Sequence, residues 1–548
     1  MRSGLSLFGV LVLLVIAGCS DGDGSQQVSL TIQTDSLPSG RVGVSYQVRL
    51  QATGGTPPYR WEVAAGQLPQ GLSLSSDGLL SGTPQTAGDY QVTIRVSDSA
   101  GGTATRTFTI RITAEVAGRE YFVSPSGDDS NPGTQERPFR TIGHAAQVVN
   151  PGDTVVVLSG TYQEAVQIER SGEEGRPITF VARGDVTLRT PTGGNFIGFR
   201  LRQGVSHIRL QGFKLHGFMW GISLDGSNSH IQIEGIEADG EGNGECGLHM
   251  TVGEHGNPWY GAVEHVTIRN CYFHHFRYCG IDGTPGPCNY IAISGVRCVD
   301  NGVEAGSAAD GISIEMGDHI IVEDCESARN QGDGIDIDSR QGRPVSEVVV
   351  RRCRSYGNFF NGIKLWWGGR IENCLVYDNG NDALVLENGG NYEVFNCTVA
   401  FNRGGYALTA GYEGSVGELY ITMRNNIFAF NGEPGNPIGV YFGQRVHLTA
   451  DYNLYHSRDF SEIVAMFLQG RDFSRDDIAR GVWTAASGCD AHAITDDPRF
   501  VNPSGRDLHL SANSPAVDRG TSEGAPNDDI DRHPRPQGRG YDLGAYER

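Results

Sequence analysis

The sequence predicts an all-β protein in which a β-sandwich precedes a solenoid of stacked parallel coils. From Val28 to about Ala114, short runs alternate apolar and polar residues and end at Gly, Pro or Asp, which is typical of a sandwich. Further along, seven units of one design follow each other, each a strand with an inward Cys or Asn and a turn Asn. Glycine supplies 77 of the 548 residues, as many tight turns require.

The 548 residues leave room for three or four domains, at roughly 150 residues per domain. The composition and the residue pattern of the chain change at four places. We therefore expect a leader at 1–18, a flexible tether at 19–27, an Ig-like sandwich at 28–115, the solenoid at 119–455 and a C-terminal cap segment at 456–548.

The leader contains one Arg and an apolar run over 5–17, which is too short to span a bilayer but fits a signal peptide. Its end, IAGC at 16–19, resembles the lipobox of bacterial lipoproteins, in which Cys19 becomes the lipidated first residue. An ordinary cleaved signal peptide with an incidental Cys is the alternative. By the same resemblance, Ser20 favours the outer membrane. We expect a cell-envelope lipoprotein, held in the outer membrane or at the cell surface by a lipid on Cys19.

The sandwich segment resembles the cadherin-like Ig modules of bacterial surface proteins over about 85 residues, including GGTPPYRWEV and GDYQVTIRVSDSAGG. Such modules act as spacers or make weak contacts with glycans or proteins. No residue pattern in this segment indicates catalysis, so we interpret it as a spacer.

After Arg119, the segment from YFVSPSGDDSNPGT to LSGTYQE resembles the N-terminal region of secreted right-handed parallel β-helix proteins. The resemblance implies a pectate lyase-like fold and an amphipathic capping helix at Thr141–Val149. The C-terminal segment, with DDPRFVNPSGRDLHLSANSPAVDRG, resembles the segment called choice-of-anchor Q. We expect it to cover the open sheet edge of the last coil.

The cysteine spacings indicate a repeat period. We expect one buried ladder of thiols, continued by Asn426, and a second ladder of turn asparagines; the thiols are Cys271, Cys298, Cys325, Cys353, Cys374 and Cys397, and the amides are Asn330, Asn358, Asn379, Asn402 and Asn431. Cys279 and Cys288 flank a Gly/Pro loop and either form a disulfide or remain free thiols.

Aligned coils also predict an outward column. Each coil has a Gly or Ala, an inward Ile or Leu and then an outward residue, and two residues later the same face continues. The first column contains Ser223, His249, Asp282, Ser313, Asp336, Lys364 and Val385, and the second contains Glu315, Asp338, Trp366 and Glu387.

Two features suggest that this face does more than meet solvent. Four carboxylates, those of Asp310, Asp333, Asp336 and Asp338, crowd into two coils, where like charges repel unless a cation binds. Lys364, one of two lysines in the chain, is expected about 5 Å from Asp336. A plain solvated face, with Lys364 in an exposed ion pair, is the alternative.

The run AADGIS, GDGIDID and NGIKL is similar to the calcium-dependent pectate lyases of polysaccharide lyase family 9. The resemblance implies that Asp310, Asp333 and Asp336 bind calcium and that Lys364 is the catalytic base. One departure is Gly332, where the family has an acidic residue, and Asp338 is the candidate to replace it. We expect Trp366, His249, Asp282 and Glu387 to contact the substrate. The ladders also resemble the alginate and chondroitin lyases of family 6.

The chemistry matches these residue types. β-Elimination from a uronic acid removes the proton alpha to the carboxylate, which requires that the carboxylate charge be neutralised, and calcium supplies that charge. A neutral lysine base also requires a nearby cation, because its reference pKa is about 10.4. The formal net charge of −21 disfavours nucleic acid as a partner, whereas an acidic polysaccharide is compatible with bound calcium. We expect a monomer.

Other functions remain open from the sequence. The same fold serves as a non-catalytic glycan binder or adhesin, and a uronate epimerase would need a second acid or base, such as His249 or a Tyr. The chain has none of the polygalacturonase motifs, which disfavours an inverting hydrolase. His274 and His275 are adjacent in a turn, and we do not expect a zinc site there, because zinc needs spaced, convergent ligands.

Overall fold

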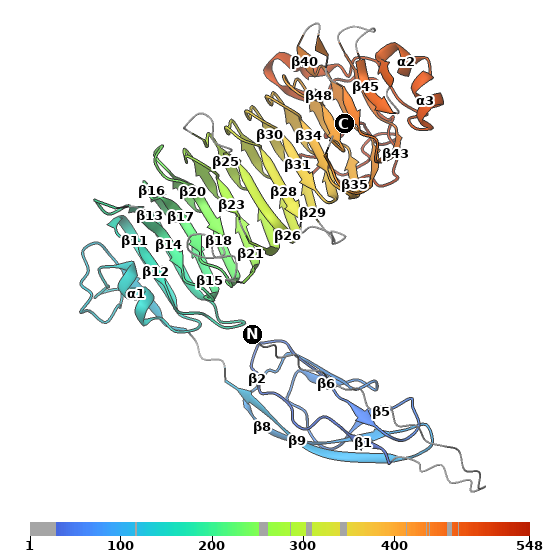
Figure 1. Ribbon diagram of the computed structural model, residues 1–548. Coiled ribbons are helices and arrows are strands. Elements are labelled where there is room, and N and C mark those ends of the chain that lie inside the picture. Colours follow the sequence, from blue (N-terminus) through green and yellow to red (C-terminus); the bar gives the residue numbers. More distant parts are fainter. Residues whose placement is uncertain are drawn as a thin grey trace, which may run out of the picture. The chain divides into compact units, whose positions relative to one another are not determined.

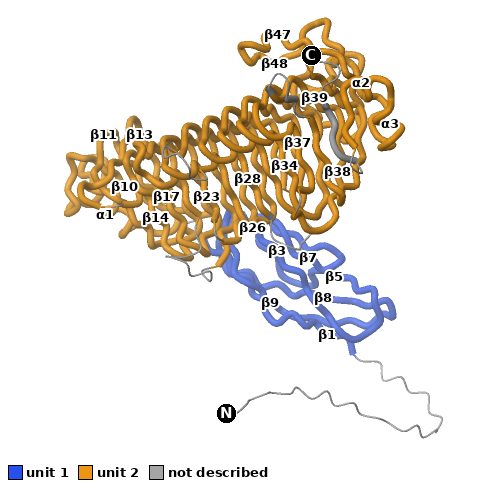
Figure 2. Tube along the Cα trace, turned by 45° about the horizontal axis from the view of Figure 1, so that its top comes forward, with its two compact units in different colours: residues 1–116 blue, residues 117–548 orange. Residues whose placement is uncertain are grey.

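The structure is a computed structural model that describes residues 29–114, 118–194, 196–250, 261–284, 286–302, 309–339, 348–412, 414–433, 436–437, 439–457, 463–468 and 471–548. The predicted leader at 1–18, the tether at 19–27 and the lipidation residue Cys19 lie outside the described residues. The chain divides into two compact units, residues up to 116 and residues from 117 onward (Figure 2). The predicted all-β class is confirmed.

The first unit is a sandwich around its own core. Its sheets have the orders β2-β9-β8-β5, β3-β7-β6 and β1-β4. In β8, Val92, Ile94 and Val96 are fully buried and alternate with polar residues, as the period-2 pattern predicts. The strands are Thr31–Ile32 (β1), Gly40–Arg41 (β2), Tyr46–Arg49 (β3), Ala52–Thr53 (β4), Arg60–Gly66 (β5), Leu72–Leu74 (β6), Leu79–Gly82 (β7), Gly88–Ser97 (β8) and Thr103–Thr113 (β9).

The second unit is a parallel β-helix whose coils each contribute strands to three series (Figure 1). Each strand pairs in parallel with its equivalent one coil away, so equivalent residues lie about 4.8 Å apart.

The first series contains Glu120–Val123 (β10), Thr154–Gln163 (β11), Ile178–Arg189 (β13), Ser206–Gln211 (β15), Ser229–Glu234 (β18), Val263–Arg269 (β21), Cys288–Ser294 (β24), Ile312–Glu323 (β26), Val348–Arg351 (β29), Gly369–Glu372 (β32), Gly390–Phe395 (β35), Leu419–Arg424 (β38) and Val446–Asp451 (β43).

The second series, called the site face below, contains Val166–Ile168 (β12), Ile197–Leu201 (β14), Trp220–Leu224 (β17), Cys246–Met250 (β20), Ile281–Gly283 (β23), the start of β26, Ile335–Ser339 (β28), Ile363–Trp366 (β31), Leu384–Glu387 (β34), Leu408–Ala410 (β37), Val440–Phe442 (β42) and Ile463–Leu468 (β45).

The third series contains Lys214–His216 (β16), Glu237–Asp239 (β19), Tyr272–His274 (β22), Arg297–Val299 (β25), Glu326–Ala328 (β27), Arg354–Tyr356 (β30), Leu375–Tyr377 (β33), Thr398–Ala400 (β36), Ile427–Ala429 (β39) and Leu454–His456 (β44).

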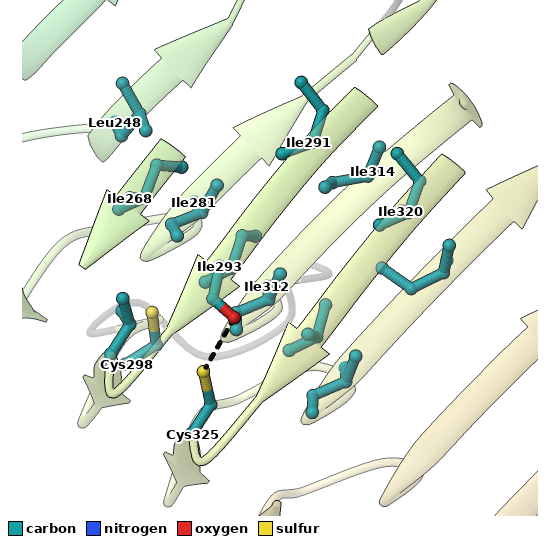
Figure 3. Close-up of a cluster of buried hydrophobic side chains, with 14 of the residues drawn as sticks. Leu248, Ile268, Ile281, Ile291, Ile293, Cys298, Ile312, Ile314, Ile320 and Cys325 are labelled. Atoms are coloured by element: carbon teal, nitrogen blue, oxygen red, sulfur yellow. Dashed lines mark hydrogen bonds between the residues drawn. The ribbon is translucent and has the colours of Figure 1, made fainter. Parts of the chain in front are cut away.

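The core of the β-helix consists of side-chain ladders. Ile268 lies beside Ile293 in the first series, and Ile281 beside Ile312 on the site face, all of them fully buried (Figure 3). Equivalent positions repeat one coil apart, so the apolar surface is continuous along the solenoid. In Figure 3 the thiol of Cys325 approaches the carbonyl oxygen of Ile293, at 3.7 Å.

The predicted thiol ladder is correct except at Cys298. The register pairs Cys298 with Phe273 and Ser327, two residues beyond the position that Cys271 and Cys325 share. Val296 takes the ladder position in that coil. Its carbonyl oxygen accepts from the backbone nitrogen of Glu326, the residue after Cys325, so Val296 lies next to Cys325 in the ladder. The ten cysteines in the described part of the chain are free thiols, Cys279 and Cys288 included.

The predicted asparagine ladder is confirmed. In each step, one amide nitrogen donates to the Oδ1 of the next coil's Asn, for example Asn330 to Asn358 and Asn358 to Asn379, both at 3.0 Å. The ladder begins one coil earlier than predicted, at Asn301, which donates to Asn330 at 3.0 Å. These amides are fully buried, so they hold adjacent turns in register.

The N-terminal end of the β-helix is closed by the predicted helix. The α1 helix spans Ile142–Val148, and the Thr141 side chain caps it by accepting from the backbone nitrogen of His144. Its buried residues, Ile142, Ala145 and Ala146, join the main core.

The C-terminal segment closes the other end only in part. There, β45 pairs with Arg471–Ser474 (β46), and the short helices Arg475–Ala479 (α2) and Val482–Ser487 (α3) bring Trp483 into the main core. The remaining short elements are Gly432–Glu433 (β40), Asn436–Pro437 (β41), Phe500–Asn502 (β47), Pro503–Gly505 (η1) and Asp507–Leu510 (β48).

Residues 500–548 instead run along the outside of the third series. Leu508, Leu543 and Tyr546 form a second core with side chains of β33, β36, β39 and β44. Arg532 reaches Asp324 at 2.7 Å. An end cap over the whole of 456–548 was therefore the wrong expectation, because the outer surface of the third series is apolar and needs cover. Within the described residues, no helix is long and apolar enough to cross a membrane.

Candidate active site

The outward column predicted from the sequence is one line of aligned residues on the site face. Strand pairing places His249 beside Asp282, Asp282 beside Ser313, Ser313 beside Asp336 and Asp336 beside Lys364. Ser223 and Val385 extend the line at its two ends. Asp336 and Lys364 are partly buried, so the charges lie in a partly desolvated surface.

Lys364 lies within reach of two carboxylates. Its Nζ is 3.5 Å from Oδ2 of Asp336 and 3.8 Å from Oδ2 of Asp333. The Lys364 side chain is 18% exposed, and those of Asp333 and Asp336 are 10% and 20% exposed. Lys364 is therefore not in the exposed ion pair that a plain solvated face would have. Solvent screens such buried charges only weakly.

Backbone hydrogen bonds fix two further members of the cluster. Asp310 precedes β26, and its Oδ1 accepts from the backbone nitrogen of Asp333 at 2.7 Å. Asp333 precedes β28, and its Oδ1 accepts from the backbone and side-chain nitrogens of Asn361, both at 2.8 Å. The second oxygen of Asp333 therefore remains directed toward Lys364.

The electrostatics reflect an excess of negative charge. Burial and the neighbouring charges of Asp333 and Asp336 raise the pKa of Asp310 to about 8. Burial raises the pKa of Asp336 to about 7, against the opposing effect of Lys364. Burial lowers the pKa of Lys364, but Asp336, Asp333 and Glu387 outweigh it and raise that pKa overall. Without another cation, Lys364 is therefore a protonated counter-ion.

The glycine at 332 is a packing requirement. A Cβ at this position would collide with Oδ1 of Asp310 and lie 2.6 Å from the backbone nitrogen of Ala309. An acidic side chain at 332 would displace Asp310. The departure from the family motif is therefore compatible with a cluster built on Asp310, Asp333 and Asp336.

These residues fit a calcium ion. Asp310, Asp333 and Asp336 place three carboxylates on two adjacent coils, two of them facing Lys364, and oxygen is the ligand atom that calcium takes. Burial is the main cause of the raised pKa values of Asp310 and Asp336, and a bound divalent cation would favour the ionised form of both carboxylates.

Trp366 is coupled to this cluster. Its Nε1 donates to Oδ1 of Asp336 at 2.9 Å, and the Nζ of Lys364 lies 4.4 Å from the centre of a Trp366 ring. The register places Asp338 and Glu387 on either side of Trp366. Asp338 therefore lies in the neighbouring column, two residues beyond Asp336. Burial raises the pKa of Glu387.

His249 and Asp282 lie further along the column. Nε2 of His249 is 3.7 Å from Oδ2 of Asp282, and the His249 ring packs on Trp220 at 4.3 Å between centroids. Burial lowers the pKa of His249. Four coil steps separate His249 from Lys364, about 19 Å. The two side chains cannot act on the same sugar ring.

Several aromatic residues near the carboxylate cluster were not predicted from the sequence as site residues. Phe359 and Phe360 are 60% and 41% exposed, and the backbone nitrogen of Phe360 donates to the carbonyl of Gly332 at 3.1 Å. Three coil steps from Lys364, Tyr441 lies on the same column and lines a hollow with Tyr412 and Arg445. In the sequence, two adjacent phenylalanines in a turn between Asn358 and Asn361 indicate that these rings are exposed.

This combination defines a class: a β-helix that presents carboxylates and a lysine on adjacent coils of one face. The family model described as "Pel9A-like, right handed beta helix region" matches residues 121–369, which include Asp310, Asp333, Asp336 and Lys364. A model for an Ig domain matches residues 27–113. The chain thus contains a Pel9A-like right-handed β-helix region after an Ig-like domain, as predicted.

Two lyases are among the relatives. Pectate lyase L of Dickeya dadantii (strain 3937) is 24% identical over 454 residues, which are 78% of this chain and 91% of that protein. Pectate lyase PEL9 of Emericella nidulans is 24% identical over 359 residues, 58% of this chain and 80% of that protein. Uncharacterized protein YwoF of Bacillus subtilis (strain 168) is 25% identical over 459 residues, 73% of this chain and 93% of that protein.

Among solved structures, the pectate lyase Pel9A is 19% identical and covers 79% of this chain and 97% of its own, with a TM-score of 0.42. A complex of XylC with xylose is 12% identical and covers 78% of this chain and 98% of its own, with a TM-score of 0.43.

Proposed function

We propose that this protein is a calcium-dependent polysaccharide lyase that cleaves a uronate-containing polysaccharide, pectate-like or alginate-like, by β-elimination. The observation that carries the proposal is the position of Lys364, which lies 3.5 Å from Asp336 and 3.8 Å from Asp333 on adjacent coils. The match of 121–369 to the Pel9A-like model and the two relatives named pectate lyase support it.

In the proposed reaction, the neutral Nζ of Lys364 accepts the proton alpha to the sugar carboxylate. The electron pair left behind forms the new carbon–carbon double bond as the glycosidic carbon–oxygen bond breaks. The leaving oxygen takes a proton from water, and Lys364 returns its proton to solvent before the next turnover. The products are an unsaturated sugar end and a new hydroxyl end. General-base catalysis of this kind contributes typically about 10²- to 10⁴-fold to a rate.

Asp310, Asp333 and Asp336 would hold the calcium. When bound, the ion supplies positive charge that neutralises the substrate carboxylate and lowers the pKa of the nearby amine. Trp366 keeps Asp336 oriented through its 2.9 Å hydrogen bond, which leaves the other Asp336 oxygen toward Lys364. Phe359 and Phe360 offer exposed ring faces on which a sugar can pack.

The alternatives find less support. An epimerase must return a proton to the opposite side of the same carbon. His249 is about 19 Å from Lys364, too far to do so, which leaves only a Tyr for that role. A glycan binder or adhesin does not require a lysine held between two partly buried carboxylates. Asp282 and His249 would, in our proposal, contact distant sugars of a long chain, and Glu387 a sugar beside Trp366.

The proposal includes the location of the protein. We propose attachment to the outer membrane by a lipid on Cys19, with the Ig-like unit as a spacer at the cell surface and the β-helix acting as a monomer. The motif IAGC at 16–19 supports this.

The test is a substrate panel. Polygalacturonate, alginate and glycosaminoglycans are each incubated with the full mature protein, with calcium or with a chelator, and the ultraviolet absorbance of the unsaturated product is followed. We expect a calcium-dependent rise on at least one uronate polymer. Absence of product on every polymer, together with measurable binding to one of them, would instead favour the glycan binder.

A further inference from the structure

We infer that Asp239, His274 and His275 form a second metal site, for a divalent transition metal of the zinc class. The three residues come from two adjacent coils of the third series, where strand pairing places Asp239 directly beside His274. Their ligand atoms all lie within 4.8 Å of one another. This site is separate from the carboxylate cluster on the site face, and it does not depend on the lyase proposal.

Although His274 and His275 are adjacent in the chain, their Nδ1 atoms converge near Asp239, as the ligands of a zinc ion must. Residue His275 has a left-handed backbone with φ of 56°, a conformation in which His is enriched among non-glycine residues. Its ring lies edge-on to that of His274, with 4.7 Å between the ring centroids. The Nδ1 atoms of His274 and His275 are 2.8 Å apart, and those nitrogens lie 3.8 Å and 3.3 Å from Oδ1 of Asp239.

Hydrogen bonds alone cannot satisfy the three facing atoms of this triad, Nδ1 of His274, Nδ1 of His275 and Oδ1 of Asp239, at the same time. A neutral imidazole Nδ1 carries either a proton or a lone pair. If His274 donates to His275, the lone pairs of His275 Nδ1 and Asp239 Oδ1 face each other at 3.3 Å. If Nδ1 of His275 carries the proton, this single N–H has to donate to both His274 and Asp239. Three lone pairs directed at one cation remove the conflict.

The spacing suits a small metal ion. Zinc binds His nitrogen and carboxylate oxygen at about 2.0–2.2 Å, so two ligands of one ion lie at most about 4.4 Å apart. The observed separations of 2.8, 3.3 and 3.8 Å satisfy this limit. Two imidazoles select a transition metal over calcium.

The surroundings support the site. The His274 side chain is 8% exposed, and its Nε2 is 3.7 Å from Oε1 of Glu237. This distance is longer than a hydrogen bond, and Nε2 has no hydrogen-bond partner among the described residues, so the ring is held by packing, including the stacked ring of Tyr272 at 4.0 Å between centroids. Asp239 is itself oriented, because its Oδ1 accepts from the backbone nitrogen of Glu241 at 2.9 Å. His275 is 51% exposed, so water can complete the coordination.

Such a site would tie two neighbouring coils together. Metal binding to the folded protein raises its stability in proportion to the logarithm of metal concentration over Kd. The zinc site would thus reinforce β19 and β22, in the coils before the carboxylate cluster.

The experiment is zinc titration calorimetry on the full mature protein, stripped of metal and then held in excess calcium so that the carboxylate cluster is occupied. We expect saturable zinc binding by the wild type. His275→Asn removes an exposed ligand and keeps a residue that tolerates a left-handed backbone. His447→Asn is the matched control, since His447 is also exposed and has a single carboxylate partner, Glu418, at 2.9 Å.

We expect His275→Asn and Asp239→Asn to lose one bound zinc per chain, while His447→Asn keeps it. With cobalt, visible ligand-field absorption should be present in the wild type and absent in His275→Asn. Wild-type protein that takes up no zinc, or zinc binding equal in all variants, would overturn the inference, the second by assigning the metal to other surface histidines.

Discussion

At the residue scale, the protonation of the carboxylate cluster depends on which cation balances it. Asp310 and Asp336 have pKa values raised to about 8 and about 7, and Lys364 supplies positive charge next to Asp333 and Asp336. The cluster thus stores an electrostatic cost in the folded protein that a divalent cation would remove. This cost is measurable without any substrate.

We predict that the chelated protein loses stability as the pH rises from about 4 to about 8. For a carboxyl whose pKa is raised on folding, the stabilising contribution is complete below the unfolded pKa and is lost as the pH passes the folded value. The ordinary value of 3.8 and the folded values of about 7 and about 8 place the start of that loss near pH 4 and its end near pH 8. Thermal unfolding in chelator measures it.

Asp310→Asn should flatten this pH dependence, because it removes the carboxyl with the highest pKa of the cluster. Calcium should reverse the trend, since it binds ionised carboxylates. A melting temperature that stays constant or rises with pH in chelator would contradict this account.

Residue patterns predicted the outward column because a Gly or Ala and then an apolar residue precede it in every coil. They did not show that a side chain at Gly332 has no room beside Asp310, because that depends on the distance between two turns. Nor did they show the convergence of His274 and His275, which follows from a left-handed backbone at His275.

At the element scale, the buried asparagine ladder sets the register that brings Asp333 and Lys364 together. Asn358 donates to the carbonyl of Ser327 at 3.2 Å and to Asn379 at 3.0 Å, and its Oδ1 accepts from the backbone nitrogen of Asn330 at 3.1 Å. Each such bond links one coil to the next.

We predict that Asn358→Ala lowers the free energy of unfolding by about 3 kcal/mol, because it leaves buried donors and acceptors unpaired at about 1–3 kcal/mol each. Urea unfolding measures the loss. Asn391→Ala, at an exposed position of β35, is the control and should change stability by less than about 0.5 kcal/mol. Equal stability of the two variants would show that the ladder is not a source of stability.

The repeat units predicted the strands well, since a turn Asn and a Gly punctuate each coil. The error at Cys298 arose from spacing alone: this residue is three positions before its turn Asn301, whereas Cys325 is five before Asn330. Alignment on the turn asparagines, which are fixed by hydrogen bonds, would have placed Val296 in the ladder.

At the scale of the β-helix, the coil spacing turns one column into a path along the solenoid axis. From Lys364 the column continues through Val385 and Thr409, whose side chains are buried, to Tyr441, about 14 Å away and beside the hollow that Arg445 lines, so a polymer would pass over these two positions without contacting their side chains. Arg445 is exposed and can pair with a carboxylate of a long polyuronate.

We predict that Arg445→Ala lowers kcat/KM about tenfold on polymer, the loss expected when a charge-assisted hydrogen bond of about 1.5 kcal/mol is removed. It should leave kcat/KM on short oligosaccharides unchanged, because these do not reach Arg445. Arg111→Ala, in the Ig-like unit, is the control. An equal loss on long and short substrates would contradict the proposed path.

The course of the C-terminal segment could not be inferred from its sequence. Its apolar residues suggested cover for an exposed sheet, but an open end and an apolar outer face both need such cover. The structure assigns Trp483 to the first role and Leu543 to the second.

The most direct test of the central claim compares the two lysines of the chain. With the polymer found in the panel and saturating calcium, the rate of unsaturated product formation is measured for wild type, Lys364→Ala and Lys214→Ala. Lys214 forms an exposed ion pair with Asp185 at 2.8 Å and lies in β16, outside the site face. We predict that Lys364→Ala loses at least about 10²-fold in kcat while retaining polymer binding, and that Lys214→Ala matches wild type. Undiminished turnover by Lys364→Ala would contradict the assignment of Lys364 as the base.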